Sequence, residues 1–131
     1  MAARISVTGM GVICAIGNNL PSVLDSLRNG RSGIRPMKYL QSRHSELPVG
    51  EVQMSNEQMK QLLGISDPAP VSRTSLMGAI AIREALAQAA VGSLSGKRVA
   101  LISGTTVGGM DVTELYFEQM KSDDSLLYLP Q

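Results

Sequence analysis

The chain alternates between short unbroken apolar runs and longer stretches in which apolar residues recur with a helical period. Val99-Ala100-Leu101-Ile102 is an apolar run with β-branched residues at both ends. It predicts a strand buried on both faces, as in a parallel sheet that helices cover. Ile5-Ser6-Val7-Thr8 alternates between apolar and polar residues and predicts a second strand, which ends at Gly9.

Helical patterns fill much of the remaining chain, and the predicted helices span residues 21–29, 55–64, 73–90 and 111–121. Pro21 suits the first turn of the first helix, and Asn29-Gly30 ends it. Ser55 and Gln58 form a capping box at the start of the second helix. Strands combined with helices in this way indicate an α/β fold of a single domain.

The stretch 73–90 is apolar around nearly its whole circumference. Arg73, Glu84 and Gln88 fall together on its one polar side, and apolar residues intrude even there. A helix of this kind is buried by more than one neighbour. Gly78 and several alanines would also permit close approach of another backbone. We therefore expect this helix inside a layered protein or at a subunit interface.

A glycine-rich loop follows the unbroken apolar run. Gly104, Gly108 and Gly109 release the chain from the predicted strand, since glycine accepts positive φ without a steric penalty. Asp111 then predicts a helix N-cap, and Glu114 completes a capping-box pattern. Such a loop is where an α/β protein builds a site, although a tight turn explains the glycines equally well.

Composition excludes several classes of function. The 131 residues carry 12 basic and 11 acidic side chains and only three Tyr and one Phe, which counts against a nucleic-acid-binding surface. No segment reaches the roughly 20 apolar residues that span a membrane. Cys14 is the single cysteine, so an intrachain disulfide and a cysteine metal cluster are excluded. We expect a cytoplasmic protein without a metal or a cofactor.

Two motifs invite functional interpretations that their residues do not support. Gly9-Met10-Gly11 is similar to the start of a dinucleotide-binding loop, yet Cys14 holds the third glycine position and no helix begins directly after it. A catalytic pair of Cys14 and His44 would need contact and a third residue to orient the imidazole, and the sequence indicates neither. A buried free cysteine is the ordinary case.

Three stretches in order resemble the β-ketoacyl-(acyl carrier protein) synthases. Residues 5–18 resemble the family's opening V-x-I/V-T-G-x-G-x-x-x-x-x-G, residues 27–34 its L-x-x-G-x-S-G-I segment, and residues 99–110 its second core strand and glycine loop. The resemblance covers essentially the whole chain. It implies that residues 1–131 form the incomplete N-terminal portion of a thiolase-like layered fold, with a mixed β-sheet covered by helices, in a homodimer.

The chemistry that the resemblance implies is a decarboxylative condensation. An acyl group is transferred to a cysteine, and malonyl-carrier protein then loses carbon dioxide and condenses with it to a β-ketoacyl product. The implied substrates are acyl and malonyl thioesters, and the implied partner is acyl carrier protein, in fatty-acid or related polyketide or polyene synthesis. The family's catalytic cysteine and histidines fall after Gln131, so we expect no catalytic residue and no activity in this chain alone.

The resemblance carries two site roles over to this sequence. Val107 and Gly108 match the part of the glycine loop that lines the acyl pocket, while plain core packing is the alternative for Val107. Arg73 matches a basic position that faces the carrier protein, and its alternative is a solvated arginine at a helix start. Thr74-Ser75 stands where the family usually has Met-Asp.

Two other functions stay open at this point. A chain-length-factor-type subunit would keep the fold, lack the cysteine and only shape the pocket of a heterodimer. A free-standing small α/β binding domain is disfavoured by the apolar helix at 73–90 and by the apolar cluster at 126–129, which suggests a chain cut short. The residue at the nucleophile position, after Gln131, would separate the condensing enzyme from the chain-length factor.

Overall fold

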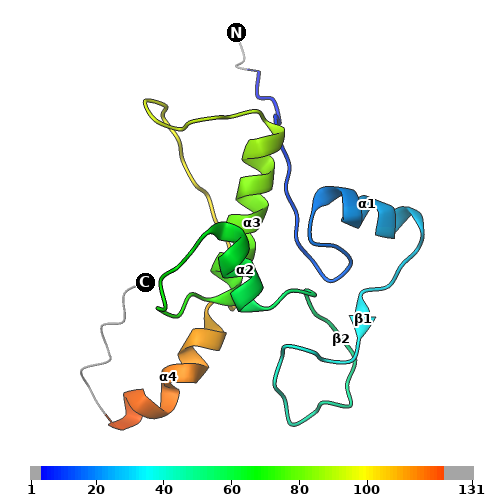
Figure 1. Cartoon of the computed structure of the whole chain (residues 1–131), viewed down its shortest axis with the longest axis vertical. Coiled ribbons are helices and arrows are strands. Elements are labelled where there is room, and N and C mark those ends of the chain that lie inside the picture. The colour runs from blue at the N-terminus through cyan, green and yellow to red at the C-terminus, as the bar shows by residue number, and fades with distance from the viewer. Residues whose placement is uncertain (1–3, 123–131) are drawn as a thin grey trace.

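The computed structural model of the chain describes residues 4–122, apart from the side chains of residues 118–120 and 122. This part of the chain is a small α/β structure with four helices and one two-stranded sheet (Figure 1). The elements in order are α1 (Leu20–Arg28), β1 (Ile34–Arg35), β2 (Val49–Gly50), α2 (Asn56–Leu63), α3 (Arg73–Gln88) and α4 (Met110–Ser122). The strands pair antiparallel, with Ile34 opposite Gly50 and Arg35 opposite Val49.

Local signals set the ends of α1 and α2, and those of α2 are the ones that the sequence predicts. Asn19 caps α1 by accepting a hydrogen bond from the Ser22 amide. Ser55 and Gln58 form the capping box of α2, and Gly64 ends that helix with φ 73°. The predicted helices around residues 21–29, 55–64 and 73–90 are therefore confirmed.

The core lies where α2 crosses α3 near the middle of the molecule (Figure 1). Met59 of α2 is 0% exposed, and Leu76 and Ile80 of α3 are 1% and 5% exposed. Leu63 packs against this cluster, whereas Leu62 remains exposed. The amphipathic face of α2 and one side of α3 thus close a small core, and the rest of the circumference of α3 stays available to other contacts.

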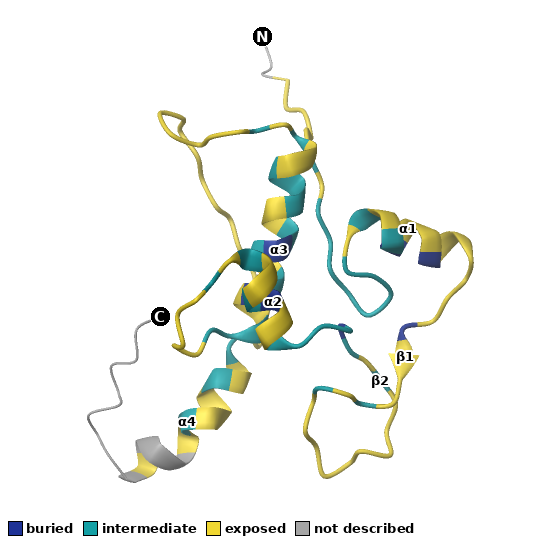
Figure 2. Ribbon diagram, viewed as in Figure 1, coloured by how far each residue is buried: buried dark blue, intermediate teal, exposed yellow. Residues whose placement is uncertain are grey.

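The two strands predicted at residues 5–8 and 99–102 do not form. Both segments are irregular and open to solvent, with Ile5 at 95% and Ile102 at 94% exposure (Figure 2). A strand needs a partner for its backbone N–H and C=O groups, and neither segment pairs with any part of the described chain. The predicted mixed sheet covered by helices is therefore absent from residues 4–122.

The fourth helix forms but starts differently from the prediction. It begins at Met110, so Asp111 lies in its first turn and is not its N-cap. Leu115 is exposed, while Val112 and Tyr116 are half-buried. The side chain of Met120 and the apolar cluster at 126–129 lie outside the described residues.

Candidate functional site

The polar side of α3 anchors the N-terminal segment, which runs alongside this helix (Figure 1). The Glu84 carboxylate accepts hydrogen bonds from the backbone amides of Val12 (2.9 Å) and Leu20 (2.7 Å). The amide oxygen of Gln88 accepts one from the Met10 amide at 2.6 Å. Because Leu20 is the first residue of α1, Glu84 also satisfies an amide that the start of a helix leaves unpaired.

Gly9 and Gly11 allow this segment to touch the helix backbone. A Cβ at Gly9 would lie 2.1 Å from the carbonyl oxygen of Ala85, and a Cβ at Gly11 would lie 1.9 Å from that of Ala81. Both distances are far inside van der Waals contact. The G-x-G motif is thus accounted for by backbone packing on α3, and no nucleotide site is needed to explain it.

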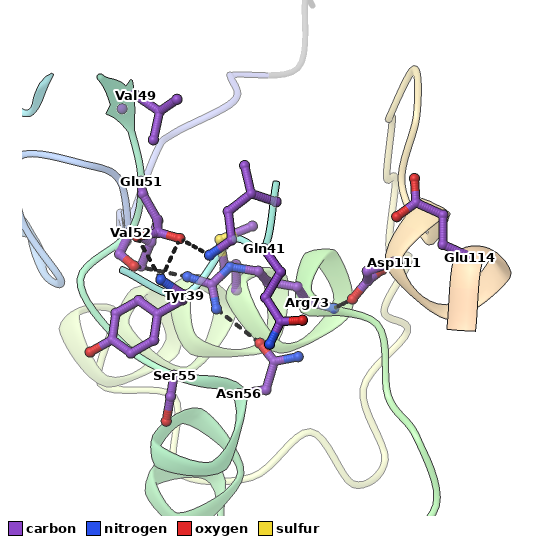
Figure 3. Close-up of a pocket in the computed structure, with 13 residues that line it drawn as sticks. Tyr39, Gln41, Val49, Glu51, Val52, Ser55, Asn56, Arg73, Asp111 and Glu114 are labelled. Carbon is purple, nitrogen blue, oxygen red and sulfur yellow. Dashed lines mark hydrogen bonds between the residues drawn. The ribbon is translucent and has the colours of Figure 1, made fainter. Parts of the chain in front are cut away.

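A polar cavity of about 630 Å³ lies where α2, α3 and α4 begin (Figure 3). The half-buried guanidinium of Arg73 crosses its floor and donates to the Asn56 side chain (2.9 Å) and to the Val52 carbonyl (2.8 Å). The backbone amide of Arg73 donates to the Asp111 carboxylate at 2.8 Å. Asp111 therefore satisfies the start of α3 and links α4 to it.

Glu51 closes the same cavity from the side of the strand pair. Its carboxylate accepts hydrogen bonds from the amides of Lys38 (2.9 Å), Tyr39 (3.0 Å) and Leu40 (2.5 Å). Desolvation by burial would raise the pKa of Glu51, but the three amide donors and the charge of Arg73 outweigh it and lower that pKa from its ordinary value. The carboxylate is thus held in its charged form by the loop that it organises.

A second hollow, of about 750 Å³, lies between α3, residues 11–13 and the glycine loop. Small residues line much of it, namely Gly11, Gly78, Ala79, Ala81, Gly104, Gly108 and Gly109. Apolar side chains, including those of Val12, Ile13 and Met77, and five Ser and Thr residues also line it. We call this hollow the α3 groove, and its low polarity suits an apolar ligand.

The described part of the chain contains neither a cluster of metal-binding side chains nor a membrane-spanning helix. Residues 4–122 contain no cluster of three or more His, Cys, Asp or Glu side chains in reach of one ion. None of the described helices is both long enough and apolar enough to cross a bilayer.

Comparison with protein families decides the family of the chain. The family profile described as "Beta-ketoacyl synthase, N-terminal domain" matches residues 2–129. The chain belongs to the β-ketoacyl synthase family. No solved structure matches this chain significantly.

Two curated relatives of this β-ketoacyl synthase chain carry informative names. "Nodulation protein E" of Rhizobium meliloti is 31% identical over 129 residues, which cover 94% of this chain and 31% of that protein. "3-oxoacyl-[acyl-carrier-protein] synthase 2" of Synechocystis is 26% identical over 113 residues, which cover 85% of this chain and 27% of that protein. The chain thus spans about a third of the length of the curated relatives that it matches.

The structure places the three site residues expected of a β-ketoacyl synthase in three different surroundings. Gly108 lines the α3 groove, and a Cβ there would lie 2.8 Å from the Thr105 side chain. Val107, its neighbour, is 71% exposed and is not among the residues that line the groove. Arg73 lies at the polar cavity with its guanidinium bound to other parts of the chain.

The single cysteine and the single histidine of this β-ketoacyl synthase chain have different bonding partners. Cys14 is half-buried and its backbone bridges to Gly17. The His44 ring lies 3.4 Å from the Glu46 carboxylate. Within the described residues no hydrogen bond joins Cys14 to His44, so the structure forms no catalytic pair from them.

The sequence interpretation missed three carboxylates that organise these sites. Glu51, Glu84 and Asp111 each accept from backbone amides of another segment. For Glu84 a signal was present, because it shares one side of the helix with Gln88 and Arg73. For Glu51 and Asp111 the partners depend on tertiary contacts that no local pattern reports.

Proposed function

We propose that this chain is the N-terminal part of a 3-oxoacyl-(acyl carrier protein) synthase. The whole protein would condense an acyl thioester with malonyl-carrier protein, with loss of carbon dioxide, in fatty-acid or related polyketide or polyene synthesis. The observation that carries this proposal is the family match over residues 2–129. The name of the Synechocystis relative supports the same reaction class.

The complete fold belongs to the same proposal. In a thiolase-like layered domain, residues 5–8 and 99–102 would gain strand partners and helices would cover them. The exposed apolar side chains of both segments support such burial, because large apolar side chains are seldom left open in a finished domain. A homodimer of the whole protein is part of this proposal.

The α3 groove is the proposed acyl site. Its small and apolar lining fits a hydrocarbon chain, and Gly108 lies in its wall. Val107 would turn toward an acyl chain once the strand before it is paired. Gly108 and Gly109, which follow Val107, supply the backbone freedom for that change, and Gly109 has φ 87°.

The proposed catalytic groups are not among these 131 residues. An acylated cysteine and two histidines that polarise the thioester would come from elsewhere in the protein. The surroundings of Cys14 and His44 support this, since no hydrogen bond joins these two described residues. Arg73 is proposed as a contact for the acidic carrier protein, with Asn56 and Val52 fixing its guanidinium.

The test is a condensation assay on the full-length protein with acyl-carrier and malonyl-carrier substrates. We expect a β-ketoacyl product and carbon dioxide from the full-length protein, and neither from residues 1–131 alone. The matched control replaces the cysteine at the nucleophile position of the full-length protein. Activity of the 131-residue chain, or an inactive full-length protein with no cysteine at that position, would overturn the proposal, the latter in favour of a chain-length factor.

A further inference from the structure

Residues 11–13 form part of the wall of the α3 groove and have little backbone support of their own. They belong to no helix or strand, and the local bridge of Cys14 to Gly17 lies just after them. The hydrogen bonds that hold the start of this segment therefore come from α3. These are the bonds of Glu84 to Val12 and of Gln88 to Met10.

Glu84 fixes the segment at two points with a single side chain. One carboxylate oxygen accepts from the amide of Val12, which lines the groove, and the other accepts from the amide of Leu20, which begins α1. Hydrogen bonds from amides to a charged carboxylate are stronger than those between neutral groups. The loop of residues 12–20 is thus clamped at both ends to one position on α3.

The same turns of α3 carry both the clamp and the groove. Ala81 and Ile82 line the groove, while Glu84 follows them in the helix and faces the amides. Gly11 also rests on the Ala81 carbonyl, so the segment cannot move closer to the helix. Steric contact at Gly11 sets the inner limit of this wall, and the Glu84 carboxylate sets the outer one.

We infer that Glu84 is a positioning residue that sets the width of the α3 groove and thereby the acyl chains that it accepts. Gln88 assists it one turn further along the helix. The role in acyl selection rests on the proposed function, whereas the clamp itself does not. A weakened clamp lets residues 10–13 swing away from α3 and changes the groove without touching the reacting atoms.

The first experiment measures the clamp by amide hydrogen exchange in the full-length protein. Glu84→Gln keeps the size of the side chain but replaces one acceptor oxygen by an NH₂ donor, so one of the two amide bonds is lost. We expect exchange at Val12 or Leu20 to become roughly ten- to hundredfold faster. The control is Glu57→Gln, since Glu57 is exposed on α2 and has no hydrogen bond or ion pair within the described residues.

The second experiment measures acyl selection by the same variants. We expect Glu84→Gln to change the ratio of kcat/KM between long and short acyl primers by roughly fivefold or more, mainly through KM. Glu84→Asp should restore the ratio in part, and Glu57→Gln should leave it unchanged. If Glu84→Gln does not fold, Gln88→Met removes only the acceptor for Met10 and should shift the ratio in the same direction by less.

The outcomes separate the two proposals. Unchanged exchange at Val12 and Leu20 in the variant overturns the clamp. Faster exchange with an unchanged primer profile in an active enzyme overturns the role in acyl selection alone. A wild-type protein that condenses no primer at all overturns the proposed function, and the acyl-selection role with it, whatever the exchange rates are.

Discussion

Single carboxylates accept hydrogen bonds from backbone amides that strand pairing would satisfy in other α/β proteins. Glu51 gathers three consecutive amides, Glu84 joins two distant ones, and Asp111 holds the first amide of α3. Each replaces water at a backbone N–H that no helix or sheet satisfies. The charge of such a group therefore matters for local order as well as for solubility.

Acidification should release the loop that Glu51 holds. Burial works to raise its pKa, but the amides of residues 38–40 and Arg73 lower it below the ordinary 4.5. A lowered folded-state pKa means that the stabilisation is present above pH about 4.5 and is lost as the pH falls through the lower folded value. Amide shifts of Lys38, Tyr39 and Leu40 should titrate together in that range. In Glu51→Gln these shifts should not move, and joint titration near neutral pH would contradict the prediction.

Gly11→Ala should destabilise the contact between the N-terminal segment and α3. The added methyl would lie 1.9 Å from the Ala81 carbonyl oxygen, and such overpacking costs about 1–3 kcal/mol or more. Urea unfolding of the full-length protein, followed by circular dichroism, measures the loss. Gly78→Ala is the control, because nothing lies within 4 Å of its added Cβ and helix propensity favours alanine by about 0.5–1 kcal/mol. Equal stability of Gly11→Ala and wild type would rule out the close approach.

Arg73→Glu should raise KM for carrier-bound substrates in the full-length enzyme. A charge at the rim of an interface acts mainly on association, so the effect should be roughly two- to fivefold and should shrink with added salt. Arg73→Lys keeps the charge but cannot hold Asn56 and Val52 together, so it reports the structural part of the loss. Kinetics unchanged by Arg73→Glu at low ionic strength would reduce Arg73 to a purely structural residue.

At the scale of elements, the local signals that bound α2 predict its ends correctly, whereas the local cap pattern at Asp111 and the patterns that need a distant partner do not. The caps at Ser55 and Gly64 lie within a few residues of the helix that they bound, so α2 could be predicted nearly to the residue. The run at 99–102 has the composition of a buried strand, but strand formation depends on a neighbour that the described chain does not provide. The polar side of α3 could be foreseen, but not which amides it binds.

A further prediction concerns Val107 in the glycine loop. In the full-length parent, Val107→Phe should block long acyl primers and spare short ones, because filling a close-fitting apolar site costs about 1–3 kcal/mol. That is roughly ten- to hundredfold in kcat/KM against long chains. The measurement is a series of primer lengths beside the melting temperature. A uniform loss over all lengths with a lowered melting temperature would assign Val107 to the core instead.

At the scale of the whole molecule, many large apolar side chains of the described residues are exposed to solvent. Ile5, Val7, Leu101 and Ile102 are all exposed, and they come from its two irregular apolar segments (Figure 2). Meanwhile the one buried cluster among the described residues is the small one between α2 and α3. A small core beside so much apolar surface is an arrangement that favours association.

The 131-residue chain on its own should therefore self-associate or remain loosely packed. We expect a broad, concentration-dependent sedimentation profile and binding of a hydrophobic dye, with the helical signal retained. Replacing Ile5 and Ile102 by Ser should reduce both without loss of helix, because neither side chain is buried. A sharp monomeric boundary with cooperative unfolding would contradict this expectation.

The hydrogen bond between Glu84 and Val12 also affects the order in which the chain folds during synthesis. The two residues lie 72 positions apart, so a ribosome adding about 5–20 residues per second makes the partner roughly 4–14 s after Val12 itself. During that interval the glycine-containing segment around Gly9 and Gly11 has no α3 to pack against, while α2 and α3 need only each other. The N-terminal segment is then accessible to processing enzymes and chaperones before it becomes part of the fold.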